Sequence, residues 1–128
     1  MVEKNKPFLH GYVTVRKFGG YALPVPVQNK LLRAYCNENY FKYALPLCEI
    51  YLENNYMNFF ATLKNIPKKS HIGMASIFMF PEGKEKFSYA LSLIKKKELQ
   101  FHFIFEDKVV RYYEIEDFYL SSFLKFYV

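Results

Sequence analysis

Short apolar segments alternate along this chain with longer segments of helical periodicity, and this alternation constrains the fold most. Residues 71–80 are almost all apolar and do not alternate with polar residues, which is typical of a strand covered on both faces. Residues 81–97 instead repeat apolar side chains on one face, which is typical of a helix. The same patterns predict further strands at residues 10–16, 41–47 and 99–105 and further helices at 27–37, 54–64 and 114–122.

Strands and helices in regular alternation predict a parallel sheet with right-handed crossover connections. We therefore expect a single α/β domain over residues 1–128, in three layers, with a mostly parallel four-stranded sheet and helices on both faces. The first and third strands should be central. Residues 108–113 should form either a turn or a small edge strand. The first helix should turn Val27, Leu31, Leu32 and Tyr35 toward the core.

Composition excludes several classes of protein. With 128 residues, 52% hydrophobic and 20% aromatic, the chain can bury one core and is not intrinsically disordered. No apolar run approaches the roughly 20 residues that a membrane helix needs, and the first residues lack the apolar stretch of a signal peptide. A cytoplasmic location and no membrane partner are therefore expected.

The formal net charge of +6 suits anionic partners. Its two lysine clusters, Lys68–Lys69 and Lys95–Lys97, fall where helices should end, and lysines there complement the helix dipole without any ligand. A nucleic-acid platform would need aromatic residues exposed on one sheet face with basic residues between them, whereas these strands read as buried on both faces. Nucleic acid is therefore an unlikely partner.

No metal or cofactor signature is present. Three histidines, His10, His71 and His102, lie far apart in sequence without an H-x-x-x-H or H-x-E pattern, which favours structural roles. The loop at Gly19–Gly20 lacks the spacing of either common nucleotide-binding motif. Two cysteines without C-x-x-C spacing are better explained as buried free thiols than as a disulfide or a metal pair. We predict neither cofactor nor metal.

A binding pocket is expected at the carboxyl ends of the central strands, where open α/β sheets place their sites. The side chains expected to bind a substrate there come from the first strand, the start of the first helix and the third strand. An acid or base would come from a carboxylate after the second or fourth strand. The predicted substrate-binding residues are Tyr12, Thr14, Arg16, Gln28, Asn29, Arg33 and Ser76, and the predicted catalytic residues are Glu49 and Glu106.

Each of these assignments has a structural alternative. Arg16 at a strand end is either an anion clamp or the partner of Glu49 or Glu106 in an ion pair that closes the sheet edge. Gln28 and Asn29 either orient a ligand or cap their helix. Ser76 has no G-x-S-x-G context, so a nucleophilic role is not expected.

Two resemblances add to these residues. The strand ending in Thr14 and Arg16, followed by a loop and a helix opening at Pro26, resembles the start of a serine-recombinase (resolvase) catalytic domain. That family carries its nucleophilic serine two residues after an arginine. Here Thr14 stands at the position of the arginine and Arg16 at the position of the nucleophilic serine. The resemblance therefore implies a resolvase-like (flavodoxin-like) fold and argues against the recombinase activity.

The second resemblance covers most of the chain and is to a small bacterial family found sporadically in carbohydrate-biosynthesis gene clusters for lipopolysaccharide O-antigen or capsule. It implies a pathway and not a reaction. The segments that carry it are Gly11-Tyr12, Arg16, Pro26-Val27-Gln28-Asn29, Arg33, Tyr35-Cys36, Glu49, residues 76–81, Phe101-His102-Phe103 and Glu106.

Together these features predict a protein that binds an anionic sugar intermediate, a sugar phosphate or nucleotide sugar. Isomerisation is the kind of proton transfer that such a cofactor-free pocket supports. The alternative is a non-catalytic scaffold or regulatory subunit of a sugar-processing enzyme. The apolar tail at residues 123–128 favours a protein contact, most simply a homodimer.

Overall fold

The computed structural model describes residues 6–20, 22–46, 48–49 and 56–127, without the side chains of residues 48–49 and 124–127. Its main sheet has five strands in the order β3-β1-β5-β6-β7. The first four run parallel, and β7 pairs antiparallel with β6. Their bounds are β3 Lys42–Ala44, β1 Phe8–Gly11, β5 His71–Met74, β6 Gln100–Phe103 and β7 Lys108–Arg111.

The sheet therefore confirms a mostly parallel α/β architecture but has five strands where the sequence predicts four. Of the two forms expected for residues 108–113, the edge strand is the one observed, as β7. Both β1 and β5 have a neighbour on each side, which agrees with the expected central positions.

The predicted first strand, residues 10–16, is divided between two sheets. The main-sheet strand β1 ends at Gly11, although the Tyr12 N–H still donates to the Gly73 carbonyl at 2.9 Å. The strand β2, Val13–Thr14, then pairs in parallel with β4, Cys48–Glu49, in a separate two-stranded sheet. The chain thus leaves the main sheet before the loop that the sequence places at the site.

The predicted strand at residues 71–80 is also too long. Strand β5 ends at Met74, and Ser76 caps a short 3₁₀ helix, η2, over Ile77–Met79. The Ser76 hydroxyl accepts a hydrogen bond from the Phe78 N–H at 3.1 Å. Ile77 and Met79 are buried. The continuous apolar pattern of residues 71–80 therefore reflects burial in the core and not an extended backbone.

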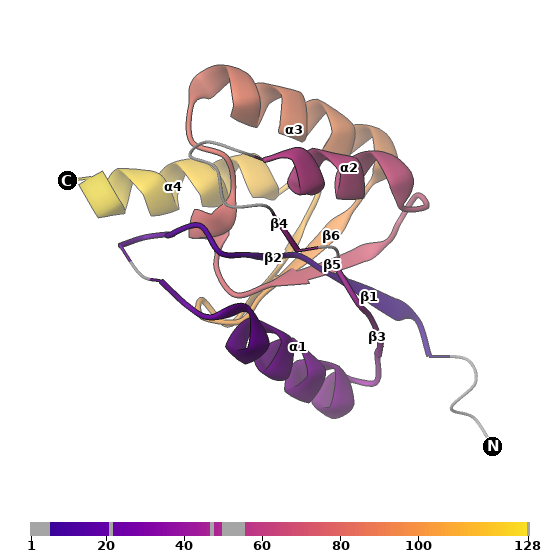
Figure 1. The fold of residues 1–128 in the computed structure, drawn as a ribbon. Helices are drawn as coiled ribbons and strands as arrows, with labels where there is room; N and C mark the ends of the chain where they lie inside the picture. Colours follow the sequence, from indigo (N-terminus) through magenta and orange to yellow (C-terminus); the bar gives the residue numbers. More distant parts are fainter. Residues whose placement is uncertain (1–5, 21, 47, 50–55, 128) are drawn as a thin grey trace.

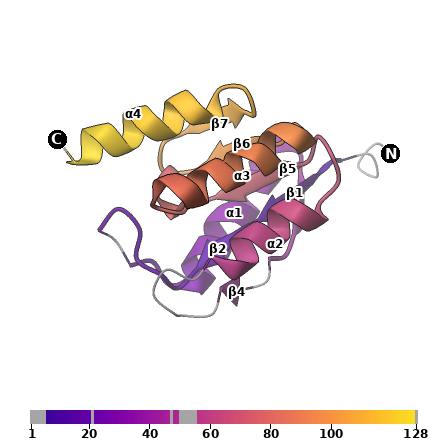
Figure 2. The same ribbon diagram turned by 90° about the horizontal axis from the view of Figure 1, so that it is seen from above.

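Helices cover both faces of the sheet (Figure 1). Helix α1, Val25–Asn39, lies alone on one face, and the view from above shows α2 and α3 on the opposite side (Figure 2). Among these described helices, none is both long and apolar enough to cross a bilayer. The other helices are α2 Met57–Asn65, α3 Lys84–Lys97 and α4 Ile115–Tyr127.

The buried face of α1 differs from the predicted one. Gln28, Leu32 and Cys36 are buried at successive i+4 positions, whereas Val27 is 41% exposed. A glutamine can take the innermost position because its amide finds hydrogen-bond partners in the backbone, as described below. The helix is therefore rotated from the face that hydrophobic spacing alone selects.

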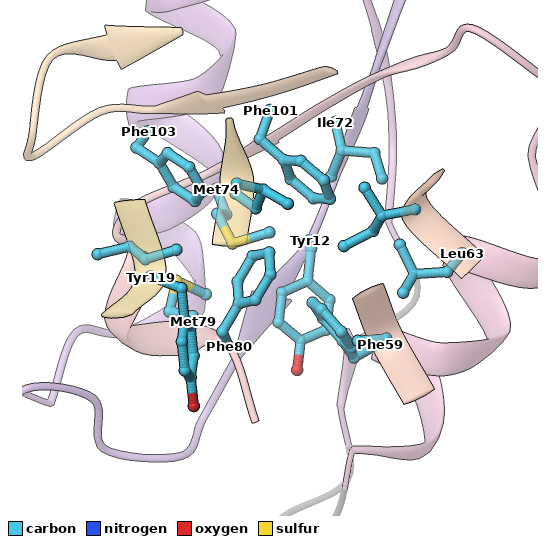
Figure 3. Close-up of a cluster of buried hydrophobic side chains, with 14 of the residues drawn as sticks. Tyr12, Phe59, Leu63, Ile72, Met74, Met79, Phe80, Phe101, Phe103 and Tyr119 are labelled. Atoms are coloured by element: carbon cyan, nitrogen blue, oxygen red, sulfur yellow. The ribbon is translucent and has the colours of Figure 1, made fainter. Parts of the chain in front are cut away.

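The larger core is built from aromatic rings between the sheet and helices α2, α3 and α4 (Figure 3). Phe80 lies at its centre, with ring centroids 5.1 Å from Phe59 and 5.2 Å from Phe101. The smaller core, between the sheet and α1, is formed by Leu9, Val13, Leu32 and Cys36.

The predicted apolar tail continues α4 up to Tyr127. Phe123 packs against the chain's own rings, with centroids 4.3 Å from Tyr119 and 5.0 Å from Phe78. The first residue of the tail therefore contributes to the core beside the loops described next.

Candidate functional site

A pocket of about 610 Å³ opens at the carboxyl edge of the main sheet. Three segments form it: the loop after β2, the turn after β5 and the turn after β6. This is the edge at which the sequence predicts a site. The lining residues are Phe18, Gly19, Ala22, Leu23, Ser76, Phe78, Phe105 and Glu106.

Ser76 and Glu106 form the polar part of this pocket. The Phe105 N–H donates to the Ala75 carbonyl at 2.8 Å, which continues the β5–β6 pairing and sets Glu106 beside Ser76. The Ser76 hydroxyl donates to Glu106 Oε2 at 2.7 Å, and the Ile77 N–H donates to Glu106 Oε1 at 3.1 Å. Two donors from the η2 segment therefore hold the carboxylate in a defined orientation.

Aromatic side chains form the walls. Phe18 is buried, while Phe105 is 49% exposed, and their ring centroids lie 6.4 Å apart. Gly19 adopts a φ of +55°, and a Cβ atom at this position would lie 3.3 Å from the Phe78 ring. Glycine here suits both the left-handed backbone and the close contact that brings the loop onto Phe78.

The charge in the pocket is negative. Glu106 is the single ionisable residue among those described as lining it, and no described Lys or Arg forms an ion pair with its carboxylate. An ionised carboxylate only accepts hydrogen bonds. The pocket is therefore suited to a small molecule with an apolar face and at least one hydrogen-bond donor.

Arg16 and Tyr12 are not among the residues described as lining the pocket. The Arg16 guanidinium donates to the Tyr12 hydroxyl at 3.0 Å and to the Met79 carbonyl at 3.2 Å. It also stacks 4.0 Å above the Tyr56 ring. These contacts join the end of β2 to η2. Among the described side chains Arg16 forms no ion pair with Glu106. The alternative pair with Glu49 involves a side chain outside the described part of the structure, and the anion-clamp role stays a prediction.

Thr14 and Gln28 are fully buried against each other and are not among the residues described as lining this pocket. Gln28 Nε2 donates to the carbonyls of Thr14 and Leu23, each at 2.7 Å, and Gln28 Oε1 accepts from the Thr14 N–H at 3.2 Å. No side-chain hydrogen bond of Gln28 caps α1, and its predicted role in substrate binding stays a prediction. Its amide ties α1 to β2 and to Leu23 in the pocket wall.

The remaining predicted residues lie elsewhere. Asn29 Oδ1 accepts a hydrogen bond from the Tyr43 hydroxyl at 2.6 Å, and the exposed Arg33 lies over the Tyr43 ring at 5.4 Å. Both are on the α1 side of the sheet. The side chain of Glu49 lies outside the described part of the structure, so its predicted catalytic role stays a prediction.

Two histidines that are distant in sequence meet beneath α1. His71 Nδ1 and His102 Nε2 are 3.0 Å apart, and the Tyr35 hydroxyl lies 2.6 Å from His102 Nδ1. Burial first, and the nearby His71 second, together lower the pKa of His102 to about 4. The pKa of His71 is lowered by burial and by His10. Neutral imidazoles at pH 7 therefore connect α1, β5 and β6.

Burial also raises the pKa of the Cys36 thiol to about 11, so this cysteine stays protonated at neutral pH. Among the described residues, no three histidine, cysteine or acidic side chains gather as a metal-ligand set.

Sequence reasoning located Ser76 and Glu106 at this edge but missed Phe18 and Phe105. Phe105 directly precedes Glu106 at the end of a predicted strand, which is the signal that could have placed it. Phe18 precedes the glycine pair of the first loop and carries no comparable signal. Comparison of the chain with protein-family models, with curated proteins and with solved structures finds no match in any of the three.

Proposed function

We propose that this protein serves bacterial surface-carbohydrate synthesis in the cytoplasm by binding a sugar intermediate in the pocket at the carboxyl edge of the sheet. The observation that carries the proposal is the Ser76–Glu106 pair, which presents a fixed carboxylate among aromatic rings. A sugar ring offers hydroxyl donors to a carboxylate and C–H faces to aromatic side chains. The resemblance to a carbohydrate-cluster family points to the same class of ligand.

The strand order supports this position for the site. Numbered along the chain, the five strands of the main sheet follow the order 2-1-3-4-5, with the last strand reversed. The flavodoxin-like class has this order, and its ligands bind at the switch point between its first and third strands, outside their carboxyl ends. In this protein the loops after β1–β2 and β5 meet at the pocket. We propose on this basis a flavodoxin-like, resolvase-related fold.

The charge distribution refines the expected anionic intermediate. Arg16 contacts Tyr12 and Met79, and Arg33 lies on the α1 side of the sheet, so neither is among the pocket lining. We propose that the hydroxyl-bearing ring enters the pocket and that any phosphate extends into solvent. Glu106 is then placed to act as the acid or base if the bound sugar is isomerised.

Removal of the carboxylate should weaken sugar binding. In a thermal-shift and calorimetric screen of sugars, sugar phosphates and nucleotide sugars, we expect at least one to stabilise the protein. Glu106→Gln should weaken that ligand by about 10- to 100-fold, because an amide replaces a charged acceptor. The exposed Glu85 provides the control, and Glu85→Gln should bind like the original protein.

Two outcomes would contradict the proposal. One is a screen in which no sugar of any class binds. The other is a sugar whose affinity is the same for Glu106→Gln and Glu85→Gln. Co-purification of a sugar-processing enzyme with a protein that binds no sugar would favour the scaffold alternative instead.

A further inference from the structure

We propose that the ligand of the Glu106 pocket carries a free amino group, so that an amino sugar is preferred over its hydroxyl and N-acetyl counterparts. This inference rests on the proposed function and names the substrate class of the same site. Its starting point is the carboxylate of Glu106, the single charged group among the described lining residues.

The hydrogen bonds of Glu106 leave it able to accept more. A carboxylate has about four lone-pair positions on its two oxygens. Ser76 occupies one position on Oε2 and the Ile77 N–H occupies one on Oε1. Both of these donors are neutral, so they orient the carboxylate without cancelling its charge. A ligand in the pocket therefore meets a directed, negatively charged acceptor.

A bound ligand must also satisfy the charge. When a ligand fills the pocket, water leaves the carboxylate, and a charge without a counter-charge is costly to desolvate. A hydroxyl supplies one hydrogen bond, whereas an ammonium supplies a hydrogen bond and a full positive charge. No described Lys or Arg forms an ion pair with Glu106, so the counter-charge has to come from the ligand.

The walls favour a cation as well. Phe18, Phe78 and Phe105 all line the same pocket as Glu106. The face of an aromatic ring attracts a cation within about 6 Å of its centroid, and the attraction increases when water is excluded. A carboxylate among aromatic rings is thus a site for an ammonium group attached to an apolar ring face. An N-acetyl group would lose the charge and add bulk.

The test uses ring compounds that differ in one group. Cyclohexylamine and cyclohexanol share a ring and differ in amine against hydroxyl, and glucosamine, glucose and N-acetylglucosamine repeat the comparison on a sugar. Titrations followed by protein NMR report the dissociation constants and locate the shifts. We expect each amine to bind about tenfold tighter than its neutral partner at pH 7, a difference of ~1.4 kcal/mol.

Glu106→Gln should remove this preference, because glutamine keeps acceptor and donor atoms at the same position without the charge. Glu85→Gln, an exposed carboxylate on α3, should retain it. A preference for the amine that persists in Glu106→Gln would overturn the assignment to this site.

The sugar and non-sugar pairs separate the two proposals. Equal binding of amine and hydroxyl compounds, or no pocket shifts with either cyclohexyl compound, overturns the amine inference. Binding of glucose without any amine preference leaves the proposed function standing and overturns the inference alone. Preference for cyclohexylamine with no binding of any sugar supports an amine site and contradicts the proposed carbohydrate function.

Discussion

Replacing Gln28 with Met is expected to lower the free energy of unfolding by about 4 kcal/mol, among the larger effects of a single substitution. The side chain is fully buried and makes three hydrogen bonds to the backbone. Methionine has a similar length and fills the space but offers no partner to the Thr14 N–H or to the carbonyls of Thr14 and Leu23. The loss therefore measures unsatisfied polar groups and not a cavity.

Urea denaturation followed by circular dichroism gives the difference directly. Lys30→Met is the matched control, because Lys30 is exposed on the same helix, and it should change stability by less than about 0.5 kcal/mol. If Gln28→Met were within 1 kcal/mol of this control, the tie between α1 and β2 would not be a main determinant of stability. Because Leu23 lines the pocket, the same substitution should also weaken ligand binding.

Acidification from pH 7 to pH 4 is expected to cost about 3 kcal/mol of stability through His102 alone. In the folded protein the pKa of His102 is lowered from 6.5 to about 4. Between these values the unfolded chain binds a proton that the folded chain does not, so stability falls as the pH falls. The loss begins near pH 6.5 and is complete below about pH 4. His71 and His10, whose pKa values are also lowered, act in the same direction.

His102→Gln isolates this contribution. Glutamine does not titrate, so the variant should lose less stability on acidification, although it should be less stable than the original chain at pH 7. Its amide can still hydrogen-bond to both Tyr35 and His71. His10 lies in β1 and makes neither of these hydrogen bonds, so His10→Gln should change the slope far less. Equal slopes of stability against pH for His102→Gln and the original chain would show that the pair does not govern acid sensitivity.

Local pattern was sufficient for the architecture because hydrophobic spacing and breakers act over a few residues. Four strands of the main sheet and all four helices overlap segments predicted from the sequence, although α1, α2 and α4 extend beyond the predicted bounds. The errors have nonlocal causes. The segment at residues 71–80 is buried throughout, yet it turns at Ser76, whose hydroxyl caps η2 and meets Glu106 from a distant strand end. Burial alone does not distinguish an extended strand from a buried turn.

The candidate site, too, is predictable from the sequence only in part. Its edge of the sheet follows from chain order, since the carboxyl ends of parallel strands lie together. The roles of individual side chains do not follow, because each polar group selects its partner from atoms distant in sequence. The Gln28 amide hydrogen-bonds to the backbone, the Arg16 guanidinium donates to Tyr12 and to the Met79 carbonyl, and Glu106 lines the pocket.

The sequence by itself determined the α/β alternation, the mostly parallel sheet and the edge at which the pocket lies, since these depend on periodicity and on the direction of the chain. Only the tertiary structure decided which polar residues hydrogen-bond within the fold and which line the pocket. It also brought His71 and His102 together across neighbouring strands. Hydrogen-bond partnership is a property of three-dimensional proximity, and no local pattern encodes it.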